Sequence, residues 1–353
     1  MPAKEKPPLP TRIVAITRNI SLLVIRQLSS LLHRALSVAR NLTVAAARKA
    51  SGGWKRYVRE GGAHVKFGWA AGAAYMELLD PNRVSFKITK GRRRVDAKLF
   101  KPHPRTAVIL AFGQSNIANE GDPNGLHVPD HGVYNFNIFD GKIYVARCPL
   151  LGTTCARGNF TTRLGDLLVQ RGIYDKVLLV PVGHGGTYIT DWAPGGSMNF
   201  RLMFALELLR RRGIAITHAL FQQGEAEGYQ SNADGAAWAR NFEAMVEGVR
   251  LLGMQAPIYV AQCSICRCNP SPTIRAAQRG VVNPAKSIYP GPDTDTIVGD
   301  GRWDGCHFST AGLKKAAELW FDAITIASIT GHNVEQILPA PQRVVHGAGG
   351  RGS

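Results

Sequence analysis

The sequence predicts an α/β fold, a three-layer α/β/α sandwich built around a mostly parallel sheet of five strands. Three observations lead to this prediction: short apolar runs, longer segments of helical periodicity between them, and a 353-residue chain that is 45% hydrophobic, enough to fill a large core. Strands that alternate with helices along a chain pair in parallel through right-handed crossovers, which place helices on both faces of the sheet.

The expected strands are the apolar runs, and the expected helices are the segments whose apolar residues recur at helical spacing. The runs lie at 108–112, 177–182, 218–222, 258–262 and, more weakly, 296–298. The helical segments lie at 161–171, 199–212, 235–252 and 311–327. In a parallel sheet of this kind, functional groups gather beyond the carboxyl ends of the strands, and candidate residues are expected there.

The residues before 106 are predicted to form separate segments. Residues 13–49 contain no Pro or Gly and interleave Ile, Leu, Val and Ala with Arg, which is typical of a long basic amphipathic helix. The basic cluster at 92–94 fits a solvated turn between short strands. The predicted organisation is a basic helical extension at 1–53, an accessory or linking segment at 54–105, the α/β domain at 106–330 and a C-terminal tail at 331–353.

The net charge of +18 is concentrated towards the start of the chain. Residues 1–60 hold twelve Lys or Arg against two acidic residues, Glu5 and Glu60, which favours contact with an acidic surface. One interpretation is a helix that lies on an anionic membrane through residues 13–49. The alternatives are a helix packed on the domain or on a partner, and an organellar transit peptide. Nucleic acid is disfavoured as a partner because the segment lacks an aromatic stacking pattern.

Arginines interrupt each apolar stretch of this N-terminal segment, so neither an ordinary signal peptide nor a transmembrane span is expected there. The six cysteines are an even number, which permits three disulfides without requiring one. The C-x-x-C-x-C run at 263–268 has no evident fourth ligand, so we expect no metal. These features leave the compartment open.

The first expected strand is followed at once by Gly113-Gln114-Ser115-Asn116. A serine on a tight turn after a buried strand projects its hydroxyl into the crevice, where nearby backbone N–H groups face an anion. The alternative is that Ser115 only caps a helix. Ile117 stands where the G-x-S-x-G elbow needs glycine, so the turn is not that elbow.

The next two expected strands also end in candidate residues. Residues 183–187 form a glycine-rich loop that lets the backbone approach a ligand and point an N–H at a developing oxyanion, and their spacing excludes a phosphate loop. After the following strand, the amide of Gln223 can donate to an oxyanion, and Glu225 can anchor the loop. Ordinary polar residues at a strand end are the alternative for Gln223 and Glu225.

Asp304 and His307 lie on one loop just before the last expected helix. Serine becomes a strong nucleophile only when a base removes its proton, and an imidazole base needs a carboxylate to fix its tautomer. Alone, the loop also fits a simple helix start with Ser309 as its cap. Four strand-end motifs in this order favour a serine hydrolase in which Ser115 attacks, His307 is the general base and Asp304 orients it.

In these motifs, residues 106–328 resemble the SGNH hydrolases, and among them the sialate O-acetylesterase-like group that includes the acetyl xylan esterases of carbohydrate esterase family six. Gln114 and Asn116 complete the Gly-Gln-Ser-Asn block of that group, and residues 185–187 are similar to its Gly-Gly-Thr block. Residues 274–278 resemble a recurrent Arg-x-x-Gln helix, whereas Phe221 and Gln222 depart from the Trp that usually precedes Gln-Gly-Glu. The resemblance implies a flavodoxin-like SGNH hydrolase fold.

The resemblance also implies a function and a set of site residues. It implies removal of O-acetyl groups from a carbohydrate without metal or cofactor, by an oxyanion hole of Ser115 N, Gly186 N, or less favourably Gly185 N, and the Gln223 amide. The residues that it implies as substrate-binding or supporting are Gln114, Asn116, Gly185, Thr187 and Glu225. A polysaccharide substrate would place the protein outside the cytoplasm or at a membrane surface. The alternatives are a membrane-associated lipid esterase or thioesterase and a non-catalytic carbohydrate-binding protein of the same fold.

Overall fold

The structure is a computed structural model that describes the backbone of residues 89–331 and the side chains of residues 89–325. The predicted helix at 13–49 lies outside the described residues, as do most of the linking segment and nearly all of the C-terminal tail. The proposed division of the chain into four segments therefore stays a prediction. Within the described part of the chain, no helix is both long and apolar enough to cross a membrane.

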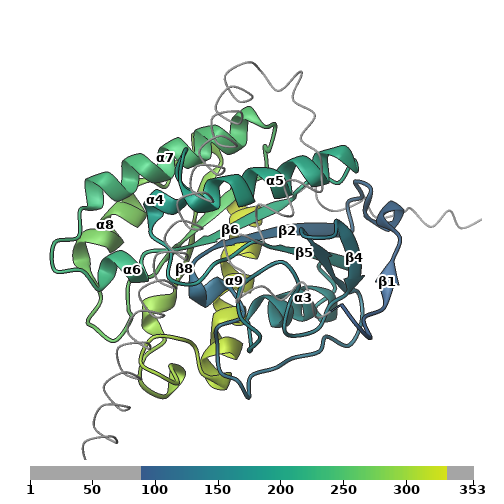
Figure 1. Cartoon of the computed structure of the whole chain (residues 1–353), viewed down its shortest axis with the longest axis horizontal. Coiled ribbons are helices and arrows are strands. Elements are labelled where there is room, and N and C mark those ends of the chain that lie inside the picture. Colours follow the sequence, from purple (N-terminus) through teal and green to yellow (C-terminus); the bar gives the residue numbers. More distant parts are fainter. Residues whose placement is uncertain (1–88, 332–353) are drawn as a thin grey trace, which may run out of the picture. The chain divides into compact units, whose positions relative to one another are not determined.

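One mixed sheet of eight strands forms the middle layer (Figure 1). In chain order the strands are β1 (Arg94–Val95), β2 (Thr106–Gly113), β3 (Val133–Asn137), β4 (Lys142–Val145), β5 (Lys176–Pro181), β6 (His218–Gln222), β7 (Ile258–Gln262) and β8 (Ile288–Asp293). Their order across the sheet is β1-β4-β3-β5-β2-β6-β7-β8. All neighbours from β3 to β8 pair in parallel, while β4 runs antiparallel to both β1 and β3. The α/β class is confirmed, and the prediction of five strands is wrong.

The last predicted strand, at 296–298, is also wrong. Thr294–Thr296 forms a short 3-10 helix, and the sheet ends instead at β8, whose sequence contains Pro290 and Gly291. Proline is tolerated there because β8 is an edge strand that pairs only with β7. A Cβ at Gly291 would lie 2.8 Å from the backbone nitrogen of Ala261, so glycine permits the close approach of the two strands.

Helices cover both faces of the sheet (Figure 1). The helices are α3 (Thr161–Gln170) and α9 (Thr310–Gly331) on one face, and α4 (Ile189–Trp192), α5 (Ser197–Arg211), α7 (Gly235–Leu251) and α8 (Pro272–Gly280) on the other. Alternate residues of the fully buried strand β2 point to the two layers. Ile109 joins the core cluster that contains Trp320 of α9, and Phe112 packs against Trp192 of α4, with ring centroids 6.0 Å apart.

The predicted solvated turn at 92–94 is wrong for Arg92. Its guanidinium is buried, where it donates to the carbonyl oxygens of Arg147, at 3.2 Å, and Pro149. Burial lowers the pKa of Arg92 to about 10. Arg94 begins strand β1, which pairs with β4 and so extends the sheet.

Candidate active site

The turn that carries Ser115 begins at the carboxyl end of β2, in the middle of the sheet. Gly113 has a φ of +127°, and a Cβ there would overlap the backbone of Gln222 on β6, so the turn requires glycine. Gln114, rather than Ser115, occupies the N-cap position of the short helix η3 (Ser115–Ile117), which does not support the helix-cap alternative. Among the described residues, the Ser115 N–H has no acceptor, which leaves it free to face an anion.

The neighbours of the serine tie its turn to the end of β6 and to the loop before α9. Gln114 Oε1 accepts hydrogen bonds from the backbone N–H groups of Gly224 and Ala226, at 3.1 and 3.2 Å. Asn116 Nδ2 donates to Glu225 Oε1 at 2.9 Å and to the carbonyl oxygen of Cys306 at 3.3 Å.

The same asparagine also receives a bond from the loop of the predicted base. Asn116 Oδ1 accepts from the backbone N–H of Phe308 at 3.3 Å. Asn116 therefore contacts the residues on both sides of His307, and so brings the base to the turn of the predicted nucleophile.

Asp304 and His307 form a local pair on the loop before α9. The imidazole Nδ1 lies 2.8 Å from Asp304 Oδ2, while Asp304 Oδ1 accepts from the backbone N–H groups of Cys306 and His307 at 2.9 and 2.7 Å. Burial alone would raise the pKa of Asp304, but the hydrogen bonds from His307 and Cys306 hold it below its usual value. The ionised carboxylate thus fixes Nδ1 as the protonated nitrogen and leaves Nε2 to act as the base.

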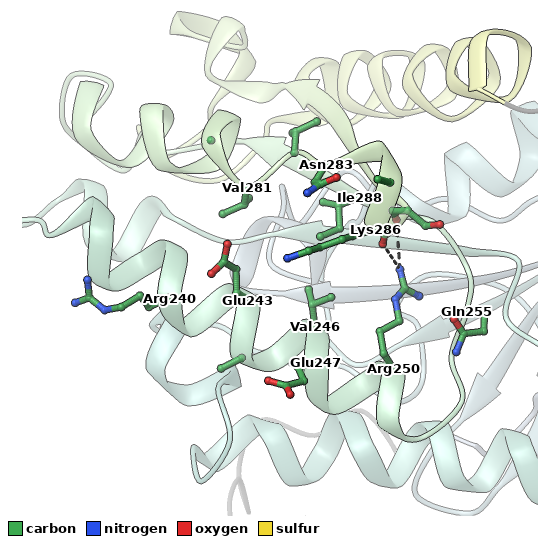
Figure 2. Close-up of a pocket in the computed structure, with 15 residues that line it drawn as sticks. Arg240, Glu243, Val246, Glu247, Arg250, Gln255, Val281, Asn283, Lys286 and Ile288 are labelled. Atoms are coloured by element: carbon green, nitrogen blue, oxygen red, sulfur yellow. Dashed lines mark hydrogen bonds between the residues drawn. The ribbon is translucent and has the colours of Figure 1, made fainter.

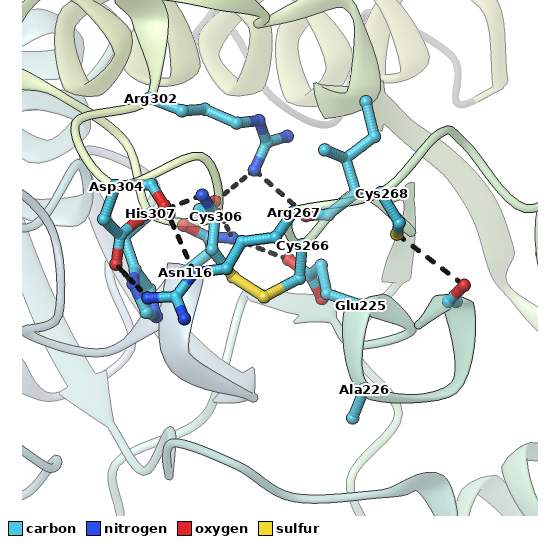
Figure 3. The surroundings of a disulfide bond; sticks show 12 residues. Asn116, Glu225, Ala226, Cys266, Arg267, Cys268, Arg302, Asp304, Cys306 and His307 are labelled. Atoms are coloured by element: carbon cyan, nitrogen blue, oxygen red, sulfur yellow. Dashed lines mark hydrogen bonds and ion pairs between the residues drawn. A yellow bond between two sulfur atoms is a disulfide. The ribbon is translucent and has the colours of Figure 1, made fainter. Parts of the chain in front are cut away.

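A disulfide joins this loop to the loop after β7 (Figure 3). It links Cys266 to Cys306, the residue directly before His307. The buried guanidinium of Arg302 donates to the carbonyl oxygens of Ile265, at 3.3 Å, and Cys306, so it bridges the same two loops. The four other cysteines are not part of this disulfide, and the described residues contain no cluster of three or more metal-ligating side chains.

The two glycines at 185 and 186, in the loop after β5, differ in whether their backbone N–H is already engaged. The Gly185 N–H already donates to the Thr154 hydroxyl at 3.0 Å. The Gly186 N–H has no acceptor among the described residues, and its φ of +70° is a conformation that favours glycine. Thr187 holds the loop, because its hydroxyl donates to the His184 carbonyl oxygen at 2.9 Å and accepts from Trp192 Nε1 at 3.0 Å. Of the two glycines, Gly186 is the one whose N–H can meet an oxyanion.

Gln223 lies between the serine turn and the glycine-rich loop, but its amide is already engaged. Nε2 donates to Gln114 Oε1 at 3.3 Å, to the Thr187 carbonyl oxygen at 3.2 Å and to Glu227 Oε2 at 2.5 Å. The side chain is 1% exposed, and its Oε1 accepts from Trp238 Nε1 at 2.8 Å. A bond from Gln223 to an oxyanion would have to replace one of these three, so its role as the third donor stays a prediction.

Comparison with known families identifies the family to which this chain belongs. The sequence model of a family described as carbohydrate esterase, sialic acid-specific acetylesterase, matches residues 105–325, more than half of the chain. The chain belongs to this family. It is therefore a carboxylic ester hydrolase of the carbohydrate acetylesterase type, and its predicted reaction class and its resemblance to the sialate O-acetylesterase-like group are confirmed.

Among solved structures, one from Arabidopsis thaliana shows the same fold. A protein from Arabidopsis thaliana is 20% identical, with a TM-score of 0.53, and the match covers 63% of this chain and 99% of that one. NanS is 15% identical over 64% of this chain and 98% of its own, with a TM-score of 0.45. A carbohydrate acetylesterase from Xanthomonas citri is 14% identical over 64% of this chain and 56% of its own, also with a TM-score of 0.45. No curated protein matches the sequence significantly.

The esterase site also contains acidic residues that the sequence motifs did not indicate. Glu120 Oε2 lies 3.9 Å from His307 Nε2, and Glu120 Oε1 accepts from the Thr154 hydroxyl at 2.7 Å. Glu227 accepts from the backbone N–H of Ile189 at 2.6 Å, and burial raises its pKa. Neither glutamate directly follows a strand, so strand-end position could not single them out.

A large cavity of the esterase lies away from the site around Ser115 (Figure 2). It has a volume of about 770 Å³ and lies between α7 and the segment 280–288. Charged side chains of both signs line it, among them Glu243, Arg250 and Lys286, and none of its lining residues belongs to the site around Ser115. Arg250 is held by the carbonyl oxygens of residues 254 and 256, each at 2.7 Å. Cavity size therefore does not locate the chemistry of this protein.

Proposed function

We propose that the protein removes O-acetyl groups from a carbohydrate through an acyl-enzyme on Ser115. The observation that carries this proposal is the Asp304–His307 pair, 2.8 Å apart, whose loop Asn116 ties to the serine turn. His307 Nε2 takes the proton of the Ser115 hydroxyl, and Ser115 Oγ attacks the ester carbonyl carbon. The tetrahedral intermediate collapses as His307 returns the proton to the departing sugar oxygen, which leaves an acetyl group on Ser115.

Water completes the cycle. His307 Nε2 takes a proton from water, whose oxygen attacks the acetyl carbonyl, and the bond to Ser115 Oγ breaks as that oxygen regains the proton. Acetate is released. In both steps the N–H groups of Ser115 and Gly186 donate to the oxyanion, and we propose the Gln223 amide as a third donor after it gives up a present acceptor. One such donor contributes about 10²–10³-fold in kcat.

The nucleophile assignment is tested with p-nitrophenyl acetate. Ser115→Ala removes the attacking oxygen, so kcat falls by about 10⁴-fold or more. The variant also loses labelling by a fluorophosphonate probe, which reacts with activated serines. Retained activity or labelling in a Ser115→Ala protein of wild-type thermal stability would remove Ser115 from the mechanism.

The acyl preference is tested with p-nitrophenyl esters of increasing chain length. An enzyme for acetyl groups loses kcat/KM as the acyl chain lengthens, because the longer chain has no site to occupy. A maximum at long chains would favour the lipid esterase alternative instead.

We further propose that residues 13–49 bind an anionic membrane surface, a proposal that rests on their basic amphipathic sequence. The full chain should sediment with vesicles that contain phosphatidylserine and not with pure phosphatidylcholine vesicles. Replacing the arginines Arg18, Arg26, Arg34 and Arg40 with Gln should abolish this binding and leave p-nitrophenyl acetate hydrolysis unchanged. Binding that does not depend on vesicle charge would rule the proposal out.

A further inference from the structure

We propose that Glu120 determines which sugars this site accepts: its carboxylate binds a hydroxyl or ammonium group next to the ester and excludes a sugar carboxylate there. The inference rests on the proposed function and names the substrate class of the same site. Glu120 is a specificity-determining residue in this proposal, because it faces the leaving sugar and takes no proton.

Glu120 is held beside the base by its surroundings. The backbone of the preceding residue is fixed, because the Asn119 N–H donates to the Thr154 carbonyl oxygen at 3.1 Å. The Thr154 hydroxyl donates to Glu120 Oε1 at 2.7 Å, and Oε2 lies 3.9 Å from His307 Nε2. The Glu120 side chain is 14% exposed and that of His307 is 19% exposed, so both are partly accessible to solvent.

The glycine-rich loop makes room for this carboxylate. A Cβ at Gly185 would overlap the carboxylate oxygens of Glu120. The same Thr154 hydroxyl that donates to Glu120 accepts from the Gly185 N–H at 3.0 Å. Glycine at 185 therefore allows Glu120 to lie against the glycine-rich loop. A larger residue at 185 would displace the Glu120 carboxylate.

The reaction brings the leaving sugar to the same place. The oxygen that leaves must lie within about 3 Å of His307 Nε2 to receive its proton. Since Glu120 Oε2 is 3.9 Å from that nitrogen, substituents on the carbons next to the ester come within its reach. An ionised carboxylate only accepts hydrogen bonds, so it favours hydroxyl and ammonium donors and repels another carboxylate.

The charge of Glu120 is not neutralised by an arginine. Arg267 pairs with Asp304 Oδ2 at 3.7 Å, and the guanidinium of Arg157 lies over the ring of Trp303, 5.0 Å from its centroid. Of the Lys, Arg and His side chains within residues 89–325, only the imidazole of His307 lies within 4.0 Å of the Glu120 carboxylate, and it is neutral when it acts as the base. A carboxylate beside the ester would therefore meet an uncompensated negative charge.

The test compares two substrates that differ at one carbon. Methyl 4-O-acetylglucoside carries a hydroxymethyl group on the ring carbon next to the acetylated carbon. Methyl 4-O-acetylglucuronoside carries a carboxylate on that same ring carbon. The wild-type enzyme should prefer the glucoside by about tenfold or more in kcat/KM, the effect of one hydrogen bond to a charged group. Glu120→Gln keeps the shape of the side chain and should lower that preference at least several-fold.

Asp322→Asn is the matched control, because it removes an exposed carboxylate from α9 and should keep the wild-type preference. An unchanged preference in Glu120→Gln would overturn the inference, as would an equal loss on both sugars and on p-nitrophenyl acetate. If wild type hydrolysed p-nitrophenyl acetate through Ser115 but neither sugar, the carbohydrate proposal itself would fail, and the inference with it. Thermal melting verifies that each variant is folded.

Discussion

Asn116 contributes more to the site than its place beside the serine indicates. Its amide contacts the buried carboxylate of Glu225, the carbonyl oxygen of Cys306 and the N–H of Phe308. One side chain thus joins the ends of β2 and β6 to the loop of the base. Because these bonds are buried, loss of the amide leaves the Phe308 N–H without its acceptor, and it also frees the loop that holds His307.

Asn116→Ala should therefore lower kcat for p-nitrophenyl acetate by about 100-fold, the cost of a misplaced catalytic group, while KM changes little. The free energy of unfolding should fall by about 1–3 kcal/mol, measured by urea denaturation. Asn124→Ala removes an exposed asparagine and is the control. A variant that loses stability but keeps the wild-type kcat would show that Asn116 only supports the fold.

The lowered pKa of Asp304 predicts the shape of the pH profile. Its folded-state pKa lies below the unfolded value, so its hydrogen bonds stabilise the fold fully above the unfolded pKa and are lost as pH falls through the folded one. Between pH 5 and 8 Asp304 stays ionised, so it should not add a second ionisation to the acid side of the profile. The logarithm of kcat/KM should thus rise with a slope of about one on the acid side. A slope of two would show that Asp304 titrates with the base.

At the residue scale, the motifs predicted Ser115, Asp304 and His307 as one site, and the structure pairs the last two directly. Glu120 could not be predicted in this way. Its partner Thr154 is 34 residues away, and the two meet only because the chain brings residues 119 and 154 together in irregular loops. Sequence spacing carries no information about such contacts.

At the scale of elements, the loop of the base is held by a covalent link. The Cys266–Cys306 disulfide closes a sequence separation of 40 residues, which corresponds to about 3–4 kcal/mol in the chain-entropy account. Cys266→Ser should lower the melting temperature and reduce kcat more than it raises KM, because the loop that carries His307 loses one attachment. Wild type treated with dithiothreitol should behave in the same way.

Two comparisons separate the effect of the disulfide from effects of the reductant elsewhere in the chain. Cys268→Ser removes a free thiol of the same loop and should retain both the wild-type kcat and its sensitivity to dithiothreitol. Cys266→Ser should no longer respond to dithiothreitol. If reductant inactivated the Cys266→Ser variant as well, the effect would arise elsewhere in the chain.

The elements differ in how well the sequence reveals them. The four helices predicted between residues 161 and 327 are confirmed, because each is long enough for its apolar residues to repeat at helical spacing. β3 was missed because buried Asn135 interrupts its apolar pattern, although the fold satisfies that side chain through the N–H and carbonyl of Leu151, at 2.6 and 3.0 Å. β8 was missed because Pro290 and Gly291 favour a turn, and only its edge position makes a strand acceptable.

At the scale of the whole molecule, the order of the strands explains why the site lies where it does. β2 is central, with β5 on one side and β6 on the other, and these three strands carry the serine turn, the glycine-rich loop and Gln223 at their carboxyl ends. The sequence predicted this convergence, since parallel strands bring their carboxyl ends to one edge. It could not predict the order of the outer strands, which depends on contacts between distant segments.

The same order predicts how protection from hydrogen exchange varies across the sheet. Amides of β2 pair on both sides and are covered by helices on both faces, so they should exchange only through global unfolding. β8 pairs on one side only, with β7, and half of its backbone faces away from the sheet, so its amides should exchange through local opening. Hydrogen–deuterium exchange with mass spectrometry on the full chain measures both in one experiment. Equal protection of β8 and β2 would mean that the sheet opens as one unit. The edge strand next to the disulfide-linked loop would then be as rigid as β2, the strand that leads to Ser115.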